Sequence, residues 1–580
     1  MGTRQKCQPD RPPCTPLGSQ TSPTAADGSE WQAIRVELEQ AAPKGGLNIA
    51  HAAVTRHADG PLARRPALCW LSDDRHRREM SFAELERLTN RVANGFKGLG
   101  LISGQTVATL CGREPELYLS AIGALKAGGV FCALYPSYGP EPIHHRLAAG
   151  RAVILVTTQR HYEKIRAIRH RLPDLKHVLL IDSPGPHDPR VVRLQDVIDA
   201  ADDNFTVPPT DPESPALIHF TSGTTGMPKG VVHVHAAALH HLLTGRKVLD
   251  LKVTDRYWCT ADPGWVTGVI YGFLVPLMAG VTTLIDIDEF DVRRWLRILS
   301  DERISIWYTS PSALRRLMTL PFKPCEHYDL KSLRLVFSVG EPLNARTVQW
   351  SMDALGLPVR DTWWQTETGG IMIANHSAEP VHPGAMGRPV DGIIAESVQT
   401  TADGQATRCA TGEIGELAIA TAWPSMFRGL LGDTDAYGQR FIGQWYLSGD
   451  LVRRDDDGII WFVGRSDDMI KTAGHLVSPF EVESVLLAYP GVAEAGVVGI
   501  PDDHLGQRVL AYIALTPGIG ANDRLSSQIM AFARQRLGPA LAPREIRFTD
   551  AMPKNRAGKI VRRKLAKLSD APAGISVEPS

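Results

Sequence analysis

Apolar residues in the first third of the chain recur in two patterns. Four short runs are apolar almost throughout, as expected of strands buried on both faces of a sheet. These runs are residues 107–110, 130–134, 153–156 and 178–181. Helical patterns alternate with them: Ser81 and Glu84 form a capping box that begins a helix with Leu85, Val92 and Phe96 on one face. This alternation predicts an α/β fold with doubly wound, mostly parallel sheets.

The pattern changes near the C-terminal end of the chain. Ser478 and Glu481, with Pro479 at the first helical position, predict a helix that carries Val482 and Leu486 on one face. Residues 497–500 and 509–515 have the composition of strands. A chain of 580 residues is too long for one hydrophobic core. We therefore expect a large N-terminal domain and a small α+β C-terminal domain.

Charge and cysteine content narrow the class of protein. The 63 basic residues balance the 63 acidic ones, which gives no support for nucleic acid or an anionic membrane as a partner. The eight cysteines are scattered and none forms CxxC, so we expect free thiols in a reducing, cytoplasmic compartment. Residues 1–30 are rich in Pro, Thr, Ser and Gln and lack the apolar stretch of a secretory signal; we expect a disordered tail.

Two segments allow either a functional or a purely structural interpretation. Residues 264–285 carry no charge and are long enough to cross a membrane, but repeated glycines and a proline favour core strands and helices. Four histidines, His233, His235, His240 and His241, suggest a metal site. No HExxH pattern or cysteine accompanies them, so we favour histidines of a strand end and a helix start.

The stretch FTSGTTGMPKG, residues 220–230, has the chemistry of a polyphosphate site. It follows an apolar run, residues 216–220, that predicts a buried strand, and precedes a helical pattern over residues 235–248. Its glycines let the backbone approach a ligand, and its hydroxyls and Lys229 offer donors and charge to phosphate oxygens. It is not a P-loop, because Pro228 precedes Lys229 and Gly230 follows it. Composition alone is equally consistent with a flexible surface loop.

The order of residues in TSGTTGMPKG resembles the phosphate loop of the adenylate-forming enzymes, which include acyl-CoA synthetases, peptide-synthetase adenylation domains and luciferases. The resemblance covers residues 45–566 and is greatest to AMP-forming acetyl-CoA synthetases. It implies a large domain at residues 31–466, a mobile small domain at residues 467–568 that turns about Asp467, and a tail at residues 569–580. It also implies ATP and CoA as substrates and Mg²⁺ as cofactor.

The resemblance assigns ATP contacts to four segments. They are Thr221, Ser222, Gly223, Thr224, Thr225, Gly226 and Lys229 in the phosphate loop, Gly340, Glu341 and Pro342 in a VGEP turn, Asp361, Thr362, Trp363, Gln365 and Thr366 in the motif DTWWQTETGG, and Asp450 and Arg465 further on. Trp363 is implied to face adenine, Thr366 to contact the α-phosphate and Asp450 to accept hydrogen bonds from the ribose diol. Glu367 offers a hard oxygen to Mg²⁺, which needs only one or two carboxylates besides phosphate.

The same resemblance implies an acyl pocket formed by Val266, Thr267, Val339 and Trp364. An indole at position 364, across the floor of that pocket, leaves room only for a very short acid. Acetate and propionate stay open, because one methylene in an apolar pocket is worth only about 1–3 kcal/mol.

Lys559 ends a basic segment, PKNRAGK, whose plain interpretation is a solvated tail. The segment resembles the catalytic-lysine loop of the family, so its ammonium would stabilise charge on the carboxylate and α-phosphate as they join. Ala473 and Gly474 match the channel for CoA. A charge-neutralising acylation of Lys559, by a protein acylase and deacylase, would regulate such an enzyme.

One residue departs from the family pattern. Leu476 stands where the family usually has Arg, so a nucleotide contact is either missing or supplied from elsewhere. The sequence predicts an ATP-dependent ligase that forms a short acyl-AMP with release of pyrophosphate and then transfers the acyl group to CoA. Two alternatives remain: an adenylate-forming enzyme with a carrier protein or amine as acceptor, and a nucleotide-binding relative without turnover.

Overall fold

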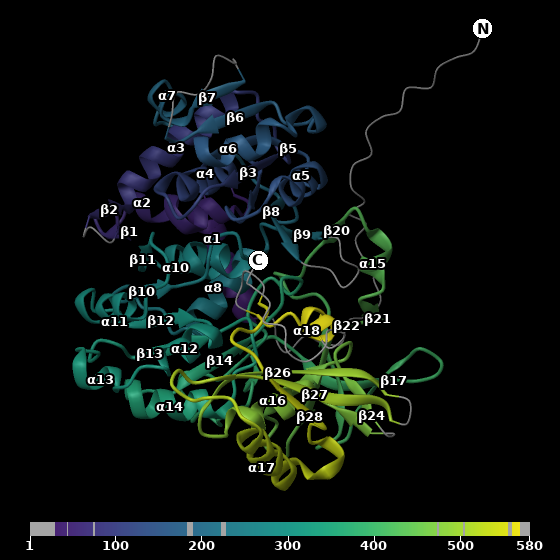
Figure 1. Ribbon diagram of the computed structural model, residues 1–580. Coiled ribbons are helices and arrows are strands. Elements are labelled where there is room, and N and C mark those ends of the chain that lie inside the picture. The colour runs from purple at the N-terminus through teal and green to yellow at the C-terminus, as the bar shows by residue number, and fades with distance from the viewer. Residues whose placement is uncertain are drawn as a thin grey trace.

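The computed structural model describes residues 29–42, 45–72, 76–182, 190–221, 228–472, 475–502, 505–554 and 559–568 (Figure 1). Most of the expected N-terminal tail and the C-terminal tail lie outside the described part. Two large sheets of mixed direction, a smaller antiparallel sheet and a C-terminal sheet organise the chain.

The first large sheet has the strand order β20-β9-β8-β4-β3-β5-β6-β7. Its strands are β3 (Thr106–Leu110), β4 (Val130–Ala133), β5 (Ala152–Thr157), β6 (His177–Leu180), β7 (Val191–Arg193), β8 (Pro215–Thr221), β9 (Lys229–Val234) and β20 (Gly429–Leu431). The strands from β8 to β7 in this order run parallel to their neighbours. The apolar runs that predicted strands at 107–110, 130–134, 153–156, 178–181 and 216–220 fall on five of these strands, and those predictions are confirmed.

Strand β9 carries His233 near its end and α8 (Ala237–Lys247) carries His240 and His241, so the expected strand end and helix start are confirmed, although the extent of β9 was not predicted. Strand β9 pairs antiparallel with β8, with Thr221 opposite Lys229, so the phosphate-loop segment joins two neighbouring strands. Val231 and Val234 are buried, and valines favour a strand. The predicted helix, α8, begins only after β9.

The second large sheet has the order β16-β15-β14-β13-β12-β10-β11-β1-β2. Its strands are β1 (Pro66–Leu71), β2 (Arg77–Ser81), β10 (Arg256–Cys259), β11 (Thr282–Asp286), β12 (Ile306–Thr309), β13 (Leu335–Ser338), β14 (Val359–Trp363), β15 (Ile373–Ala374) and β16 (Arg388–Pro389). The strands from β14 to β1 run parallel. Segments after β13 and β14 therefore leave the same edge of the sheet, where α/β folds bind ligands.

Helices pack around both sheets. They are α1 (Ser29–Ala41), η1 (His51–Thr55), α2 (Arg56–Ala58), α3 (Phe82–Gly98), α4 (Pro115–Lys126), α5 (Pro140–Ala149), α6 (Gln159–Arg166), η2 (Arg169–Arg171), α7 (Leu194–Asp199), α8, α9 (Val266–Val269), η3 (Ile270–Leu274), α10 (Val275–Met278), α11 (Val292–Asp301), α12 (Pro311–Leu317), α13 (Pro324–His327), α14 (Ala345–Leu355) and α15 (Thr434–Gly438). The predicted capping box opens α3: Ser81 Oγ accepts from Glu84 N at 3.2 Å, and Glu84 Oε2 accepts from Ser81 N at 2.8 Å.

The uncharged run at residues 264–285 forms α9, η3, α10 and β11, and most of it is buried in the core. None of the described helices combines the length and apolar character that crossing a membrane requires.

A six-stranded sheet completes the large domain, in the order β18-β17-β19-β22-β21 with β23 beside β22. Its strands are β17 (Ala395–Thr400), β18 (Ala406–Arg408), β19 (Ile414–Ala420), β21 (Phe441–Ile442), β22 (Trp445–Arg454) and β23 (Ile460–Arg465). All its pairings are antiparallel. The register places Asp450 of β22 directly opposite Arg465 of β23.

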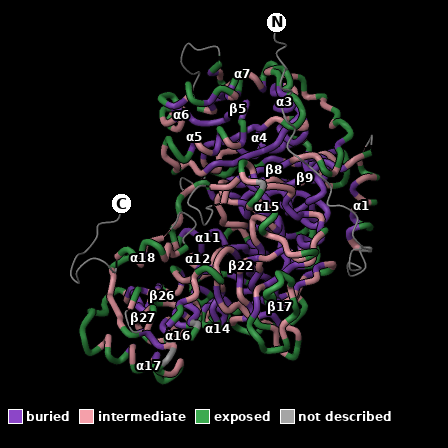
Figure 2. Tube along the Cα trace, turned by 90° about the vertical axis from the view of Figure 1, so that its right-hand side faces the viewer, coloured by how far each residue is buried: buried purple, intermediate pink, exposed green. Residues whose placement is uncertain are grey.

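The C-terminal segment forms a separate α+β unit with the sheet order β25-β24-β27-β26 and β28 beside β27. Its elements are β24 (Ile470–Thr472), β25 (His475–Val477), α16 (Pro479–Leu487), β26 (Val492–Asp502), β27 (Gly506–Leu515), α17 (Asp523–Leu541), β28 (Glu545–Phe548) and α18 (Arg562–Leu568). Val482 and Leu486 of α16 pack with Val497 and Ile513 in a core of their own. Figure 2 shows exposed segments around this unit and mostly buried chain at β8 and β9.

Candidate active site

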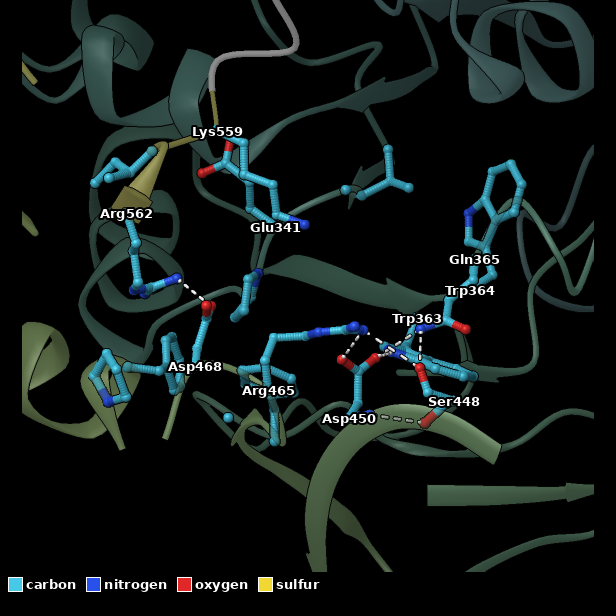
Figure 3. Close-up of a pocket in the computed structure, with 18 of the residues that line it drawn as sticks. Glu341, Trp363, Trp364, Gln365, Ser448, Asp450, Arg465, Asp468, Lys559 and Arg562 are labelled. Atoms are coloured by element: carbon cyan, nitrogen blue, oxygen red, sulfur yellow. Dashed lines mark hydrogen bonds and ion pairs between the residues drawn. The ribbon is translucent and has the colours of Figure 1, made fainter. Parts of the chain in front are cut away.

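A cavity of about 560 Å³ lies where the large domain meets the small one (Figure 3). Its volume is in the range that binds small-molecule ligands. All the site residues predicted from the sequence that belong to the described part of the chain line it. They are Thr221, Lys229, Val266, Thr267, Val339, Gly340, Glu341, Pro342, Asp361, Thr362, Trp363, Trp364, Gln365, Thr366, Glu367, Asp450, Arg465, Asp467 and Lys559. Ser222, Gly223, Thr224, Thr225, Gly226, Ala473 and Gly474 lie outside the described residues.

The VGEP turn follows β13 and needs its glycine. Gly340 has φ +91°, and a Cβ there would lie 2.3 Å from Cη2 of Trp265. Only glycine allows this backbone to pass the indole. The next residue, Glu341, accepts a hydrogen bond from Arg315 Nη2 at 2.5 Å. Arg315 also lines the cavity, and no motif in the sequence indicated it.

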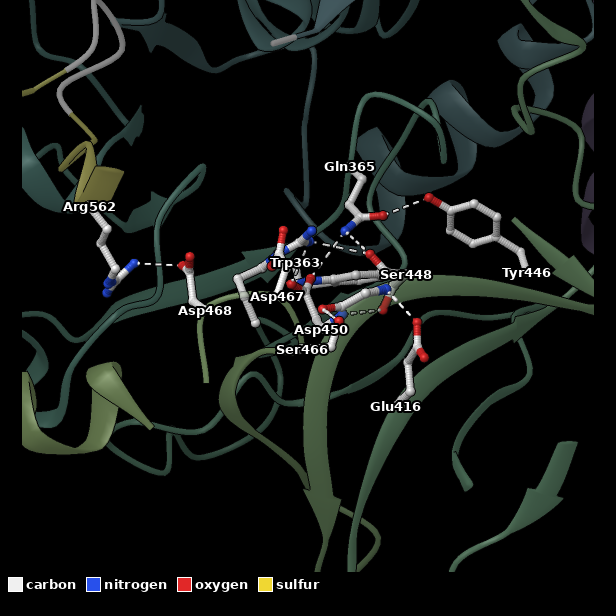
Figure 4. A network of polar contacts seen from close by, with 12 residues as sticks. Trp363, Gln365, Glu416, Tyr446, Ser448, Asp450, Ser466, Asp467, Asp468 and Arg562 are labelled. Atoms are coloured by element: carbon white, nitrogen blue, oxygen red, sulfur yellow. Dashed lines mark hydrogen bonds and ion pairs between the residues drawn. The ribbon is translucent and has the colours of Figure 1, made fainter. Parts of the chain in front are cut away.

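Trp363 and Asp450, which both line the cavity, meet in a polar network (Figure 4). Trp363 Nε1 donates to Asp450 Oδ2 at 2.8 Å, and Gln365 Nε2 donates to the same oxygen at 3.1 Å. Arg465 Nη1 donates to Asp450 Oδ1 at 3.0 Å. Tyr446 OH donates to Gln365 Oε1 at 2.7 Å, which fixes the orientation of the amide. Among the described residues Arg465 is the hydrogen-bond partner of Oδ1, which retains a lone pair for a further donor.

Charges near Asp450 belong to the same network. Arg465 Nε also donates to Asp467 Oδ1 at 3.2 Å. Burial alone would lower the pKa of Arg465, but the carboxylates of Asp450 and Asp467 raise it. The guanidinium therefore links the end of the large domain to the residue predicted to be the hinge.

Trp364 is fixed in the wall of the cavity. The residue is 8% exposed, and its ring packs edge-on against Tyr271, with ring centroids 5.2 Å apart. Its Nε1 donates to Tyr308 OH at 3.2 Å, and Tyr308 OH lies 2.7 Å from Thr362 Oγ1. An indole held by packing and a hydrogen bond presents a fixed apolar surface to this part of the cavity.

Cations reach the cavity from both domains. Lys229 Nζ lies 2.8 Å from Asp433 Oδ2, and this partner is the main cause of the lowered pKa of Asp433. Lys559 lines the cavity from the small domain. Arg562 donates to Asp468 Oδ2 at 3.0 Å and to Glu483 Oε2 at 2.8 Å. Lys559 was found from its motif, whereas Arg562 was not.

Glu367 is the carboxylate that fits a magnesium ion. It lines the cavity beside Thr366, and an adjacent carboxylate and hydroxyl match the preference of Mg²⁺ for oxygen ligands shared with phosphate. The four clustered histidines do not form a metal centre, since no group of three or more His, Cys, Asp or Glu in the described ranges is arranged to hold an ion.

Two family models match the chain. The model described as AMP-binding enzyme matches residues 54–431, and that of the AMP-binding enzyme C-terminal domain matches residues 481–559. The chain belongs to the AMP-binding enzyme family. The two matches leave the predicted hinge, Asp467, in the interval between them.

Curated relatives of this AMP-binding enzyme are named acetyl-coenzyme A synthetase. The protein of Bacillus subtilis (strain 168) is 38% identical over 90% of this chain and 90% of its own. That of Chlorobaculum tepidum is 33% identical over 90% of this chain and 83% of its own. That of Escherichia coli (strain K12) is 34% identical over 90% of this chain and 84% of its own.

Solved structures share the architecture of both domains. An anthranilate CoA ligase in complex with anthranoyl-AMP has a TM-score of 0.82 and 29% identity, and covers 90% of this chain and 98% of its own. An acyl-CoA synthetase of Brucella canis has a TM-score of 0.71 and 29% identity, over 93% of this chain and 97% of its own. The predicted fold class, a large α/β domain followed by a small α+β domain, is confirmed.

Proposed function

We propose that this AMP-binding enzyme is a ligase that activates a short carboxylate, acetate or propionate, with ATP and transfers the acyl group to CoA. The observation that carries the proposal is Trp364, which stands in the wall of the same cavity as the nucleotide motifs. Val266, Thr267 and Val339 line that cavity too, so the nucleotide motifs and the predicted acyl pocket belong to the same cavity. Relatives named acetyl-coenzyme A synthetase support this substrate class.

In the first half-reaction a carboxylate oxygen attacks the α-phosphorus of ATP, and the bond to the β-phosphate breaks as pyrophosphate leaves. Thr221, Lys229 and Thr366 bring hydroxyl and ammonium donors to the phosphates, and Lys559 stabilises the charge where carboxylate and α-phosphate join. Glu367 would hold Mg²⁺, which supplies positive charge to the phosphates when bound. No nucleophilic side chain takes part, so catalysis rests on positioning and electrostatics.

In the second half-reaction the CoA thiol attacks the acyl carbonyl and AMP leaves. We propose that the small domain, with Lys559, turns about Asp467 between the two steps, and that CoA reaches the adenylate past Ala473 and Gly474. The ion pair of Arg465 with Asp467 lies at this junction and would change in the turn, whereas Arg465 and Asp450 stay together on paired strands of the large domain.

The proposal is tested with purified protein, Mg·ATP and a panel of C2 to C8 acids, with and without CoA. Pyrophosphate, AMP and acyl-CoA are followed together. We expect CoA-dependent AMP formation that peaks at C2 or C3. A stoichiometric burst of pyrophosphate that CoA cannot turn over would point to a carrier protein or an amine as acceptor. ATP binding without pyrophosphate release for any acid would contradict the ligase and favour the relative without turnover.

We also propose that acylation of Lys559 switches the first half-reaction off. An acyl group removes the ammonium charge that the transition state needs. Chemical acetylation of the lysines, followed by treatment with a lysine deacetylase, should remove and restore acid-dependent pyrophosphate exchange in parallel with the modification of Lys559. Loss of exchange that does not track Lys559 modification would contradict the switch.

A further inference from the structure

The loop after β14 carries Thr366 and Glu367 and is held by its backbone carbonyl groups. Side chains or amides from other segments donate to most of them. The contacts are His233 Nε2 to Thr366 O at 2.8 Å, Phe427 N to Glu367 O at 3.0 Å, Trp423 Nε1 and Ser425 Oγ to Thr368 O at 2.8 Å each, His241 Nε2 to Gly369 O at 2.7 Å, and His240 Nε2 to Ile371 O at 2.8 Å. Three of these donors are histidines.

The histidines come from the elements that follow the phosphate loop. His233 lies on β9, four residues after Lys229, and His240 and His241 lie on α8. His233 therefore connects the strand that begins with Lys229 to the carbonyl of Thr366. The phosphate-loop strand and the loop with Glu367 are tied to each other through one imidazole.

The two glycines that end the motif make this contact sterically possible. A Cβ on Gly369, which has φ +68°, would lie 2.2 Å from Ser425 O and 2.7 Å from the ring of His233. A Cβ on Gly370 would lie 2.7 Å from the ring of His240. Contacts under about 3 Å force a displacement, so the glycines and histidines are matched to each other.

The three imidazoles are neutral, and each can donate from one ring nitrogen only. His233 faces two carbonyls, Thr366 O at 2.8 Å from Nε2 and Ser425 O at 3.1 Å from Nδ1, and the shorter contact favours a proton on Nε2. Burial lowers the pKa of His233 and of His240 to about 3, and that of His241 to about 4. The Nδ1 atoms of His240 and His241 are buried without a hydrogen-bond partner among the described residues. A bare Nδ1 lone pair fits a neutral ring with its proton on Nε2, pointing at the loop.

We propose that His233, His240 and His241 are positioning residues. They hold the loop so that the side chains of Thr366 and Glu367 can reach the phosphates and Mg²⁺. The proposal rests on the proposed function for its catalytic consequence, but its structural part stands by itself. Apolar residues of the same size would fill the core equally well, but they offer no hydrogen-bond donor to the carbonyl oxygens. A buried carbonyl that loses its donor is destabilised, and the loop can relax toward the cavity.

The test compares His241→Phe, which keeps the ring and removes the donor, with His241→Gln, whose amide can donate from a similar position. His57→Phe is the matched control, because His57 Nε2 lies 3.2 Å from a carbonyl outside this loop, that of Met278. Hydrogen exchange of a peptide covering residues 364–373 is measured by mass spectrometry in the free proteins. Amides of Gly369 and Ile371 in that peptide are hydrogen-bonded to Gln365 O and Tyr271 OH.

We expect about tenfold faster exchange of the loop in His241→Phe, near wild-type exchange in His241→Gln, and no change in His57→Phe. In pyrophosphate exchange, the Mg²⁺ concentration for half-maximal rate should rise about tenfold in the Phe variant and recover in the Gln variant. If His241→Phe does not fold, the same pair at His240 tests the Ile371 carbonyl.

Wild-type exchange in the Phe variant, or equal acceleration in Phe and Gln variants, would overturn the proposal. If the wild-type protein shows no acid-dependent pyrophosphate exchange at all, the proposed function fails. The hydrogen-exchange comparison still decides the positioning role in that case, because it needs no substrate.

Discussion

The large-domain wall of the cavity has a network of hydrogen bonds around buried groups besides its ion pairs, whereas the small-domain wall is held mainly by ion pairs that include partly exposed groups. On the large-domain side the carboxylate of Asp450 is 7% exposed and Trp364 is 8% exposed. On the other side Arg562 and Asp468 are 24% and 33% exposed, and Lys554 and Glu494 are 29% and 24% exposed. Exposed ion pairs contribute only about 0–1 kcal/mol each, so the second wall is easier to rearrange.

Within the described ranges, ring packing and hydrogen bonds join the two walls across the domain junction. Phe462 and Phe480 lie edge-on with centroids 5.2 Å apart, and Ser478 Oγ donates to the carbonyl of Val463. Arg346, at the start of α14, donates to the carbonyls of Leu487 and Val492 in the small domain. The large domain provides a fixed part of the binding surface, and the small domain completes it when it docks. This division suits a reaction in two steps, because the docked domain can be rearranged between them.

Removing the charge that the small domain delivers should have the largest effect. In Lys559→Gln we expect acid-dependent pyrophosphate release to fall about 10²–10³-fold, because one preorganised electrostatic contact is lost. Transfer from supplied acyl-AMP to CoA should be much less affected. Both half-reactions are measured separately by rapid quench. Lys564→Gln, at an exposed position of α18, the helix that follows Lys559, is the control. Normal adenylation by the Gln variant would refute both the catalytic assignment and the acylation switch.

Opening the fixed wall should change selectivity instead of rate. In Trp364→Gly we expect kcat/KM for a C6 acid to gain about tenfold or more relative to acetate, since each accommodated methylene is worth roughly 1–3 kcal/mol. Trp364→Phe keeps most of the bulk and should retain the preference for short acids. A chain-length profile of the Gly variant that matches the wild type would mean that Trp364 does not form the floor of the pocket.

Weakening the docking contact should separate the two half-reactions with a smaller effect. Arg346 contacts the carbonyls of Leu487 and Val492 when the small domain sits over the cavity, and Arg346→Ala removes these contacts. We therefore expect the rate of pyrophosphate release to fall roughly tenfold in this variant. Acyl transfer from supplied acyl-AMP should stay unchanged. Arg297→Ala, at an exposed site of α11, serves as the comparison variant. Equal slowing of both steps would show that Arg346 stabilises the fold without favouring one arrangement.

Local elements and single site residues could be predicted from the sequence, whereas the contacts between them could not. Uniformly apolar runs predicted β3 to β6, because a strand buried on both faces leaves a strong local signal. Family motifs located Trp363, Asp450 and Lys559, which all line one cavity. The bond between Trp363 and Asp450 joins residues 87 positions apart, and that between His233 and Thr366 joins residues 133 apart. Such pairings depend on strand order, which no local pattern specifies. For the same reason no local pattern indicated Arg315, Arg346 or Arg562.

Asp361 allows a test of the fixed wall through its pH dependence. Burial raises the pKa of this carboxyl from 3.8 to about 8. A carboxyl whose pKa is raised by folding stabilises the native state when protonated, and this contribution is lost as the pH rises from about 4 through about 8. In Asp361→Asn the uncharged side chain removes that loss. We therefore expect the unfolding midpoint of Asp361→Asn in urea to rise relative to wild type between pH 5 and pH 8 and to level off above.

Unfolding is the readout for Asp361 because its side chain also lines the cavity, where turnover would mix binding with stability. Asp456→Asn, at an exposed turn between β22 and β23, is the control and should shift the midpoint by the same amount at every pH. Parallel pH profiles for wild type and Asp361→Asn would mean that the carboxylate is solvated through the cavity mouth. The large-domain wall would then be wetter and less rigid than its hydrogen bonds indicate, and the contrast between the two walls would be one of degree.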